Sequence, residues 1–146
     1  MILPPPFCHA ATAPVDAPAK QAFAFMADGA KLGRWALGCL DTKEIEPGLF
    51  AGRSQFTGGI GYVRIVADPT LLNVDYHVGA ARNALSHQNT ARVIAGASIG
   101  RATDSCMVTL IAWRTAGMSD DDWRLICATH ESEIYVVKAM IEQESQ

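Results

Sequence analysis

The stretch MSDDDWRLICATHESEIYVVKAMIEQE, residues 118 to 144, is the longest uninterrupted helical pattern in the chain. Ser119 is suited to cap this helix, and the three aspartates after it place negative charge in the first turn, where the helix dipole favours it. Met118 and Trp123 have the spacing of a hydrophobic staple. Residues that recur every three or four positions share one face, and these are Trp123, Ile126, Cys127, His130, Ile134, Val137 and Ile141. The pattern predicts one helix, about 40 Å long at about 1.5 Å per residue, with a single buried stripe.

The middle of the chain has the pattern of an antiparallel sheet. Turn residues such as Pro47-Gly48 and Asp68-Pro69 separate segments of strand length. The predicted strands are residues 41–46, 49–56, 62–68, 72–79, 89–99 and 106–115. Within one of them the apolar side chains alternate with polar ones, since Leu72, Val74, Tyr76 and Val78 oppose Asn73, Asp75 and His77. This alternation predicts a sheet with one covered face and one wet face.

A further strand and two short helices precede these strands. Residues 7–14 have the composition of a first strand, after an extended proline-rich lead-in at residues 4–6. Pro18 is tolerated in the first turn of a helix, so a helix is expected to begin there and to stop at Asp28-Gly29. A second short helix is predicted at about residues 30–37 and carries Trp35. The expected fold is therefore α+β, and the C-terminal helix is the one element long enough to cover the sheet.

Size and charge narrow the class of protein. A chain of 146 residues with 49% hydrophobic content is expected to form a single domain over residues 1–146. The net charge is −3 and no cluster of lysine and arginine occurs, which argues against nucleic acid or an anionic membrane surface as a partner. The apolar runs are far shorter than the roughly 20 residues that span a bilayer, so no membrane insertion is expected.

The N-terminal residues and the cysteines lead us to expect a cytoplasmic protein. Residues 1–6 lack the basic and apolar regions of a signal peptide. The four cysteines, Cys8, Cys39, Cys106 and Cys127, form no closely spaced pair and are expected to be free thiols in a reducing compartment. No set of residues has metal-ligand spacing, and the glycines at 58, 59 and 61 lack the ending of a phosphate-binding loop. No metal and no cofactor are therefore expected.

The N-terminal segment resembles a known superfamily. Residues 13–23, APVDAPAKQAF, followed by Trp35, are similar to the N-terminal signature of the START-like (SRPBCC) helix-grip superfamily, in its polyketide cyclase/dehydrase and lipid-transport branch. Residues 48–52, residues 62–78 and the final helix are similar too, so the resemblance covers about residues 9–141. It implies a curved antiparallel sheet of about seven strands wrapped around the long helix, with an apolar cavity between them that binds a hydrophobic small molecule. Its motifs describe turns and core positions, so no catalytic residue can be carried over.

His130 and Tyr76 are the candidate catalytic residues. His130 lies on the stripe that should roof the cavity, where it could exchange a proton with a phenol or enol, although a hydrogen-bonded core histidine has the same pattern. Tyr76 belongs to the covered face of its strand and could offer a hydroxyl or simply pack. Cys127 lies one turn before His130 and could act as a nucleophile, but no third group that would orient the pair is visible.

Other residues are candidates for ligand contact. Arg92 could anchor a carboxylate or phenolate, or could pair on the wet face of the sheet. The tryptophans could line a pocket for a flat aromatic ligand or belong to the core. The full predicted ligand-binding set is Trp35, Phe56, Tyr76, Arg92, Trp113, Trp123, Cys127, His130 and Ile134. Small residues in the strands suggest that space is left inside, among them Ala51, Gly52, Ala91, Ala95 and Gly96.

Three functions are compatible with these patterns. The first is binding of a hydrophobic small molecule, aromatic, polyketide-like or lipid, in the cavity. The second is a polyketide cyclase/dehydratase-like enzyme that uses His130 and Tyr76 for proton transfer. The third is a protein interaction module with a filled core and an apolar patch outside. A homodimer through an exposed sheet edge is a further hypothesis.

Overall fold

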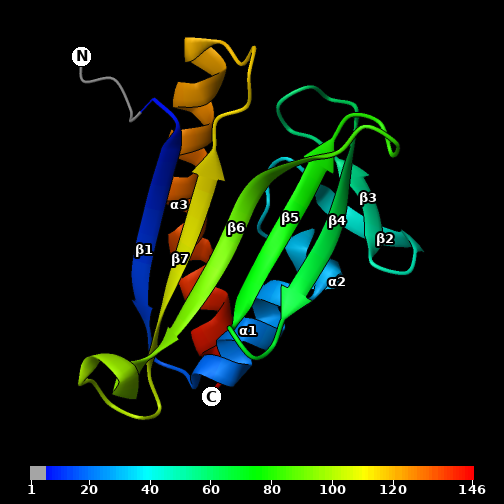
Figure 1. Cartoon of the computed structure of the whole chain (residues 1–146). Helices are drawn as coiled ribbons and strands as arrows, with labels where there is room; N and C mark the ends of the chain where they lie inside the picture. Colours follow the sequence, from blue (N-terminus) through cyan, green and yellow to red (C-terminus); the bar gives the residue numbers. More distant parts are fainter. Residues whose placement is uncertain (1–5) are drawn as a thin grey trace.

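The computed structural model describes residues 6–146 as one antiparallel sheet and a long C-terminal helix (Figure 1). The strands are β1 Cys8–Val15, β2 Leu40–Glu46, β3 Leu49–Arg53, β4 Ile60–Asp68, β5 Asn73–Gly79, β6 Ser86–Ala95 and β7 Cys106–Trp113. The helices are α1 Ala19–Ala27, α2 Gly29–Leu32, the 3-10 turn η1 Gly96–Ile99 and α3 Asp120–Glu144. The lead-in predicted from Pro4 and Pro5 lies outside the described residues.

The seven strands form one sheet in the order β1-β7-β6-β5-β4-β3-β2, and every neighbouring pair is antiparallel. The N-terminal strand therefore lies beside the last strand, while β2 forms the opposite edge. Helix α3 packs against β1 and β7, and α1 packs against β5 and β6. Both helices cover the same face of the sheet (Figure 1). This is the α+β helix-grip arrangement that the sequence predicts, with seven strands and two short helices after β1.

The start of α3 follows its sequence signals closely. Ser119 is the N-cap, and its hydroxyl accepts a hydrogen bond from the backbone N–H of Asp122 at 3.1 Å. Met118 packs against the buried cluster of Ala112, Trp123 and Cys127, as a staple predicts. Every member of the predicted stripe except Ile126 is buried, and Ile126 is half-buried against the same cluster. The helix is thereby fixed at its first turn and along its whole buried face.

The second short helix is shorter than predicted, because a side chain from β2 interrupts it. The hydroxyl of Thr42 donates to the carbonyl of Gly29 at 2.5 Å and accepts from the N–H of Gly33 at 3.1 Å. These two backbone groups would otherwise bond each other in a helix. Helix α2 therefore ends at Leu32, and residues 33–39 form a loop rather than the predicted helix that reaches residue 37.

Two predicted strands also end early. Strand β3 stops at Arg53 because Ser54 begins a tight loop, in which its hydroxyl accepts from the N–H groups of Phe56 and Thr57. Strand β6 stops at Ala95, where Gly96 bonds to the carbonyl of Ser105 and begins η1. At β3 the hydrogen bonds of Ser54 replace the strand ladder that the apolar pattern suggested, whereas at β6 the bond to Ser105 is the last step of the pairing with β7 before the chain turns into η1.

No helix in the described part of the chain is long and apolar enough to cross a membrane. The cysteines at 8, 39, 106 and 127 are all free thiols. Burial raises the pKa of both Cys39 and Cys106 to about 11, so these two groups stay protonated at neutral pH.

Candidate ligand-binding site

A partly enclosed cavity of about 260 Å³ lies between α3 and the strands β4 to β7. Its apolar walls include Leu32, Val63, Val78, Leu110 and Ile126. The volume lies just below the range of about 300 to 1,000 Å³ that is typical of small-molecule sites, so the cavity suits a compact ligand.

Two loops form the rim of the cavity. Phe56, 41% exposed, comes from the loop after β3, and its ring lies close to Gly38, where a Cβ atom would be 3.4 Å from it. The other loop is residues 33–39, before β2. A hydrogen bond joins the two loops, since the N–H of Gln55 donates to the carbonyl of Leu37 at 2.8 Å. The rim also needs the glycine at 61, because a Cβ atom there would lie 2.5 Å from the Gly38 carbonyl oxygen. The rim is therefore held by backbone contacts that leave little room for side chains.

His130 lies on the cavity wall and is held by Asn89 of β6. The side-chain amide nitrogen of Asn89 lies 3.1 Å from Nε2 of His130. Because an amide nitrogen can only donate, Nε2 accepts this bond and the proton of the neutral ring lies on Nδ1. Burial, with the nearby His9, lowers the pKa of His130 to about 4. The ring is thus neutral at pH 7 and already has a protein partner.

Tyr76 lines the same cavity from β5, but its hydroxyl also has a protein partner. It donates to the carbonyl oxygen of Met26, at the end of α1, at 2.5 Å. Its ring contacts Trp35 edge to face, with 6.4 Å between the ring centroids. Burial raises the pKa of the Tyr76 hydroxyl far above its ordinary range. Tyr76 therefore stays protonated at neutral pH and ties α1 to the sheet.

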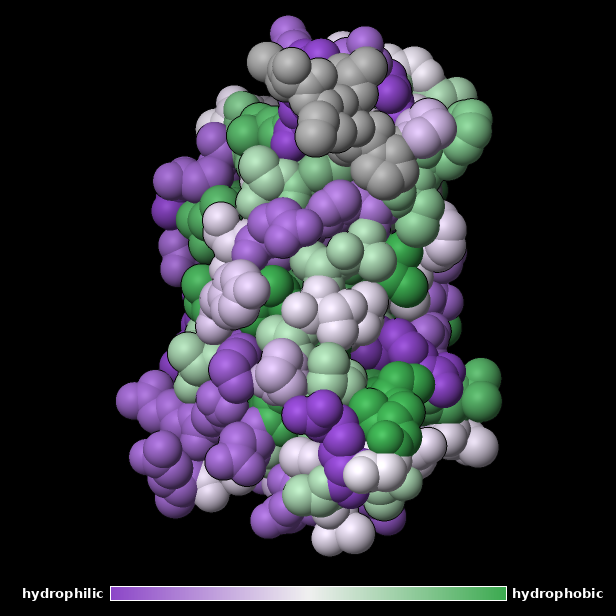
Figure 2. Space-filling view, turned by 90° about the vertical axis from the view of Figure 1, so that its left-hand side faces the viewer, coloured by the Kyte–Doolittle hydropathy of each residue, from purple (hydrophilic) through white to green (hydrophobic). Residues whose placement is uncertain are grey.

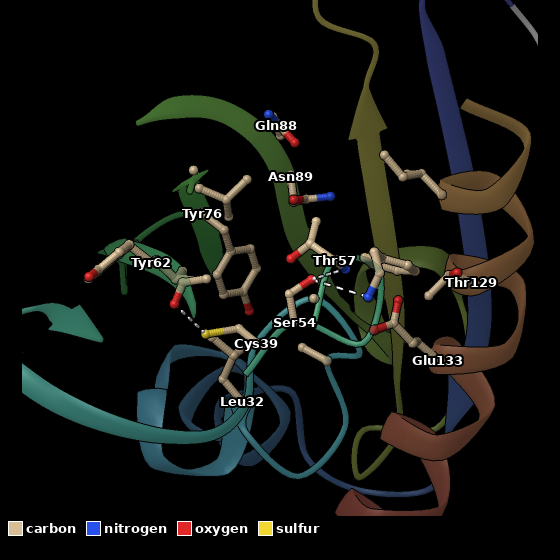
Figure 3. A pocket seen from close by; sticks show the side chains of 18 of the residues that line it. Leu32, Cys39, Ser54, Thr57, Tyr62, Tyr76, Gln88, Asn89, Thr129 and Glu133 are labelled. Atoms are coloured by element: carbon tan, nitrogen blue, oxygen red, sulfur yellow. Dashed lines mark hydrogen bonds between the residues drawn. The ribbon is translucent and has the colours of Figure 1, made fainter. Parts of the chain in front are cut away.

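Glu133 is a functional candidate that the sequence reasoning missed. Glu133 lines the cavity from α3 (Figure 3) and is 6% exposed. It follows His130 by one turn of the helix. Oε2 accepts a hydrogen bond from the backbone N–H of Leu37 at 2.9 Å. Burial raises the pKa of Glu133 to about 7, and the bond from Leu37 opposes part of that rise. A signal was present in the sequence, since position 133 adjoins the buried stripe at three residues from His130.

Four of the nine residues in the predicted ligand-binding set line this cavity. Trp35, Phe56, Tyr76 and His130 are brought together here, although they come from four different segments of the chain. Ile134 instead belongs to the main core, and Trp123 and Cys127 form a separate buried cluster with Ala112. Burial first, and then the charge of Glu131, raises the pKa of Cys127, so its thiol is a poor nucleophile at neutral pH.

The remaining two predicted contacts lie on the outer face of the sheet. The indole N–H of Trp113 donates to the hydroxyl of Thr90 at 3.2 Å, and that hydroxyl donates to Asp75 at 3.0 Å. Arg92 alternates with the buried Ala91 and Val93 of β6, so it projects on the same outer side as Thr90. Neither Arg92 nor Trp113 lines the cavity. The structure therefore shows the outer-face placement of the wet-face alternative for Arg92, but the pairing that this alternative expected is not found among the described residues.

The small strand residues do not create the cavity. Ala51, Gly52, Ala91, Ala95 and Gly96 are absent from its walls. A Cβ atom at Gly52 would lie 2.5 Å from the carbonyl oxygen of Leu40, and one at Gly96 would lie 2.3 Å from that of Ala102. The interpretation that these residues leave room inside was wrong for the two glycines, because other backbone segments fill the space beside them.

No family model and no curated protein matches this sequence. Solved structures do match it. The di-domain ARO/CYC BexL is 19% identical with a TM-score of 0.69 over 92% of this chain, which spans 46% of that protein. The Zhui aromatase/cyclase from a Streptomyces species is 16% identical with a TM-score of 0.66, over 95% of each chain. A START superfamily protein from Mycobacterium smegmatis is 10% identical with a TM-score of 0.59, over 95% of this chain and 97% of that one.

These likenesses define the class of fold. The chain has a helix-grip fold, which it shares with the two aromatase/cyclases and the START superfamily protein named above. All three identities are below 25%, so the comparisons speak to the fold and leave the ligand to be argued from the cavity itself.

Proposed function

We propose that this protein binds a compact hydrophobic small molecule in the cavity between the sheet and α3. The observation that carries the proposal is the cavity itself, whose walls are mostly apolar and aromatic and also present polar side chains such as Asn89, Thr129 and Glu133. Small-molecule sites have this composition, because burial of the apolar body supplies affinity while a few polar atoms fix orientation. The aromatase/cyclase and START names of the structural neighbours support a hydrophobic ligand.

A cavity-filling variant tests this proposal. Val78 lines the cavity from β5, and Val78→Phe is expected to occupy part of the free volume and weaken binding of naphthylethanol, a neutral probe of about the right size, by about 20-fold or more. Isothermal titration calorimetry measures the affinity. Val66→Phe on β4 is the matched control, because Val66 is half-exposed and does not line the cavity.

Two results would contradict the proposal. One is a Val78→Phe protein that folds and binds the probe as tightly as the wild type. The other is a wild-type protein that binds no member of a panel of aromatic, polyketide-like and lipid molecules.

A second candidate function is polyketide cyclase/dehydratase-like catalysis with His130 and Tyr76. Both residues line the cavity, and aromatase/cyclases are among the structural neighbours. The hydroxyl of Tyr76 and Nε2 of His130 already have hydrogen-bond partners in the protein, so either group would have to exchange its partner for substrate before it could move a proton. Binding without turnover does not require His130 or Tyr76 to give up its protein partner, so we rank it before catalysis.

The interaction-module hypothesis has less support. It requires a filled core and an apolar patch outside, whereas the core holds a cavity and Phe56 lies half-exposed on its rim. On the face seen in Figure 2, hydrophobic residues are scattered among polar ones rather than gathered into one patch. A homodimer and a cytoplasmic location stay predictions.

A further inference from the structure

The charge on the cavity wall is negative. Among the described residues that line it, Glu133 is the one carboxyl, and no lysine or arginine is present. His130 is held neutral by its burial and by the nearby His9, which lower its pKa. A ligand therefore meets a single acidic group within otherwise neutral walls.

Glu133 also lacks an ion-pair partner. Within residues 6–146 the ion pairs involve other carboxylates, and the hydrogen bond that reaches Glu133 comes from the neutral backbone N–H of Leu37. A buried carboxylate without a counter-charge is costly, so native proteins usually pair it. Since residues 6–146 supply no cation to Glu133, a cationic group on the ligand would complete the site.

The remaining walls suit such a group. The rings of Trp35, Phe56 and Tyr76 line the same cavity, and the faces of aromatic rings attract an ammonium ion. The rings also provide the apolar surface on which a carbon skeleton packs. An acidic ligand would instead find no cation, because Arg92, the candidate carboxylate anchor, projects from the outer face of the sheet.

Building on the proposed function, we propose that the natural ligand is a compact hydrophobic amine whose ammonium group pairs with the carboxylate of Glu133. Fatty acids and other carboxylates are excluded by the same reasoning. Glu133 selects ligands that carry a positive charge, and the apolar walls limit the size of the ligand.

Three probes that share one ring system and differ in charge test this inference. Naphthylethylamine, naphthylethanol and naphthylacetate are titrated into the wild-type protein at pH 8, where the amine stays protonated. The amine is expected to bind at least about 10-fold tighter than the alcohol, and the acetate weaker than the alcohol. This ranking needs no variant, so it stands even if a substitution in the cavity impairs folding.

Glu133→Gln tests the residue directly. Its amide oxygen can still accept the bond from Leu37, so the rim should keep its structure while the charge is lost. Amine affinity is expected to fall at least about 10-fold, and naphthylethanol affinity to stay within about 2-fold. Glu131→Gln is the control, because it removes the same charge from an exposed position on α3 that does not line the cavity.

The pH profile of binding provides a second readout. The titratable groups that line the cavity with Glu133 are His130 on α3, Tyr76 on β5, Tyr62 on β4 and Cys39 before β2. Because the pKa of Glu133 is about 7, amine affinity should rise between pH 6 and 8 in the wild type and stay flat in Glu133→Gln. A ligand carbonyl that accepts from the protonated carboxyl would give the opposite slope.

The outcomes separate the two proposals. If naphthylethanol binds and is weakened by Val78→Phe, but the amine gains nothing or is insensitive to Glu133→Gln, the amine inference is wrong and the cavity proposal stands. The amine inference is also wrong if naphthylacetate binds as tightly as naphthylethanol or tighter. If none of the three probes binds, the amine inference is wrong, and the cavity proposal fails as well if no member of the wider panel binds.

Discussion

Trp123→Ala is expected to lower the free energy of unfolding by about 3 to 5 kcal/mol, the usual cost of removing a large buried aromatic side chain. Trp123 is 1% exposed and packs with Ala112, Cys127 and the staple residue Met118. The loss would leave a void beneath the first turn of α3, which the neighbouring backbone cannot close. Urea denaturation followed by circular dichroism measures the change.

The same variant separates a core role from ligand contact. Trp123 does not line the cavity, so Trp123→Ala protein that remains folded should bind naphthylethanol nearly as well as the wild type. Trp113→Ala is the control, because Trp113 is 39% exposed and its loss should cost less than half as much stability. A loss below about 1 kcal/mol for Trp123→Ala, or a larger loss for Trp113→Ala, would contradict the packing described above.

Glu133→Gln is expected to stabilise the protein above pH 7, by about 3 kcal/mol. The pKa of Glu133 is raised from 4.5 to about 7, so the folded protein holds this proton where the unfolded chain has released it. By linkage, the wild type loses stability as the pH rises from about 4.5 to 7, at about 1.4 kcal/mol per pH unit of difference between the two pKa values. Glutamine has no proton to release, so the variant lacks this loss.

Urea unfolding of the wild type and Glu133→Gln between pH 4 and 8 measures the difference. It should be close to zero below pH 4.5 and largest above pH 7. His130 gives the opposite slope, because its pKa is lowered from 6.5 to about 4 and the stability it contributes is lost as the pH falls through that range. A stability difference between Glu133→Gln and the wild type that is constant with pH would contradict the burial of an ionisable Glu133.

The fold could be predicted from the sequence because the patterns that indicate its helices and strands are local and repeat along each segment. The buried stripe of α3, its Ser119 cap and its staple all lie within one segment, and the alternation at residues 72–78 fixed the covered face of β5. The end of α2 was not readable. It depends on the Thr42 hydroxyl, which reaches two helix backbone groups from a strand nine residues beyond Gly33.

The site was only partly readable, for a related reason. Alternation in β6 groups Arg92 with Thr90 and Ile94, yet it does not say whether that set faces the helix or solvent. The tryptophans carried the same ambiguity, and Trp35 faces the cavity while Trp113 does not. Glu133 was missed because a charged residue beside a helix stripe usually points to water. Its burial depends on the Leu37 N–H, 96 positions away in the chain.

The central claim is that the cavity between the sheet and α3 holds the ligand, and isotope-filtered nuclear Overhauser spectroscopy of the protein with bound naphthylethanol tests it most directly. The neutral probe keeps the result independent of the charge argument. We predict contacts from the naphthyl protons to Trp35, Tyr76 and Val78. Contacts confined to the outer face, for example to Trp113, would place the binding site elsewhere and contradict the account.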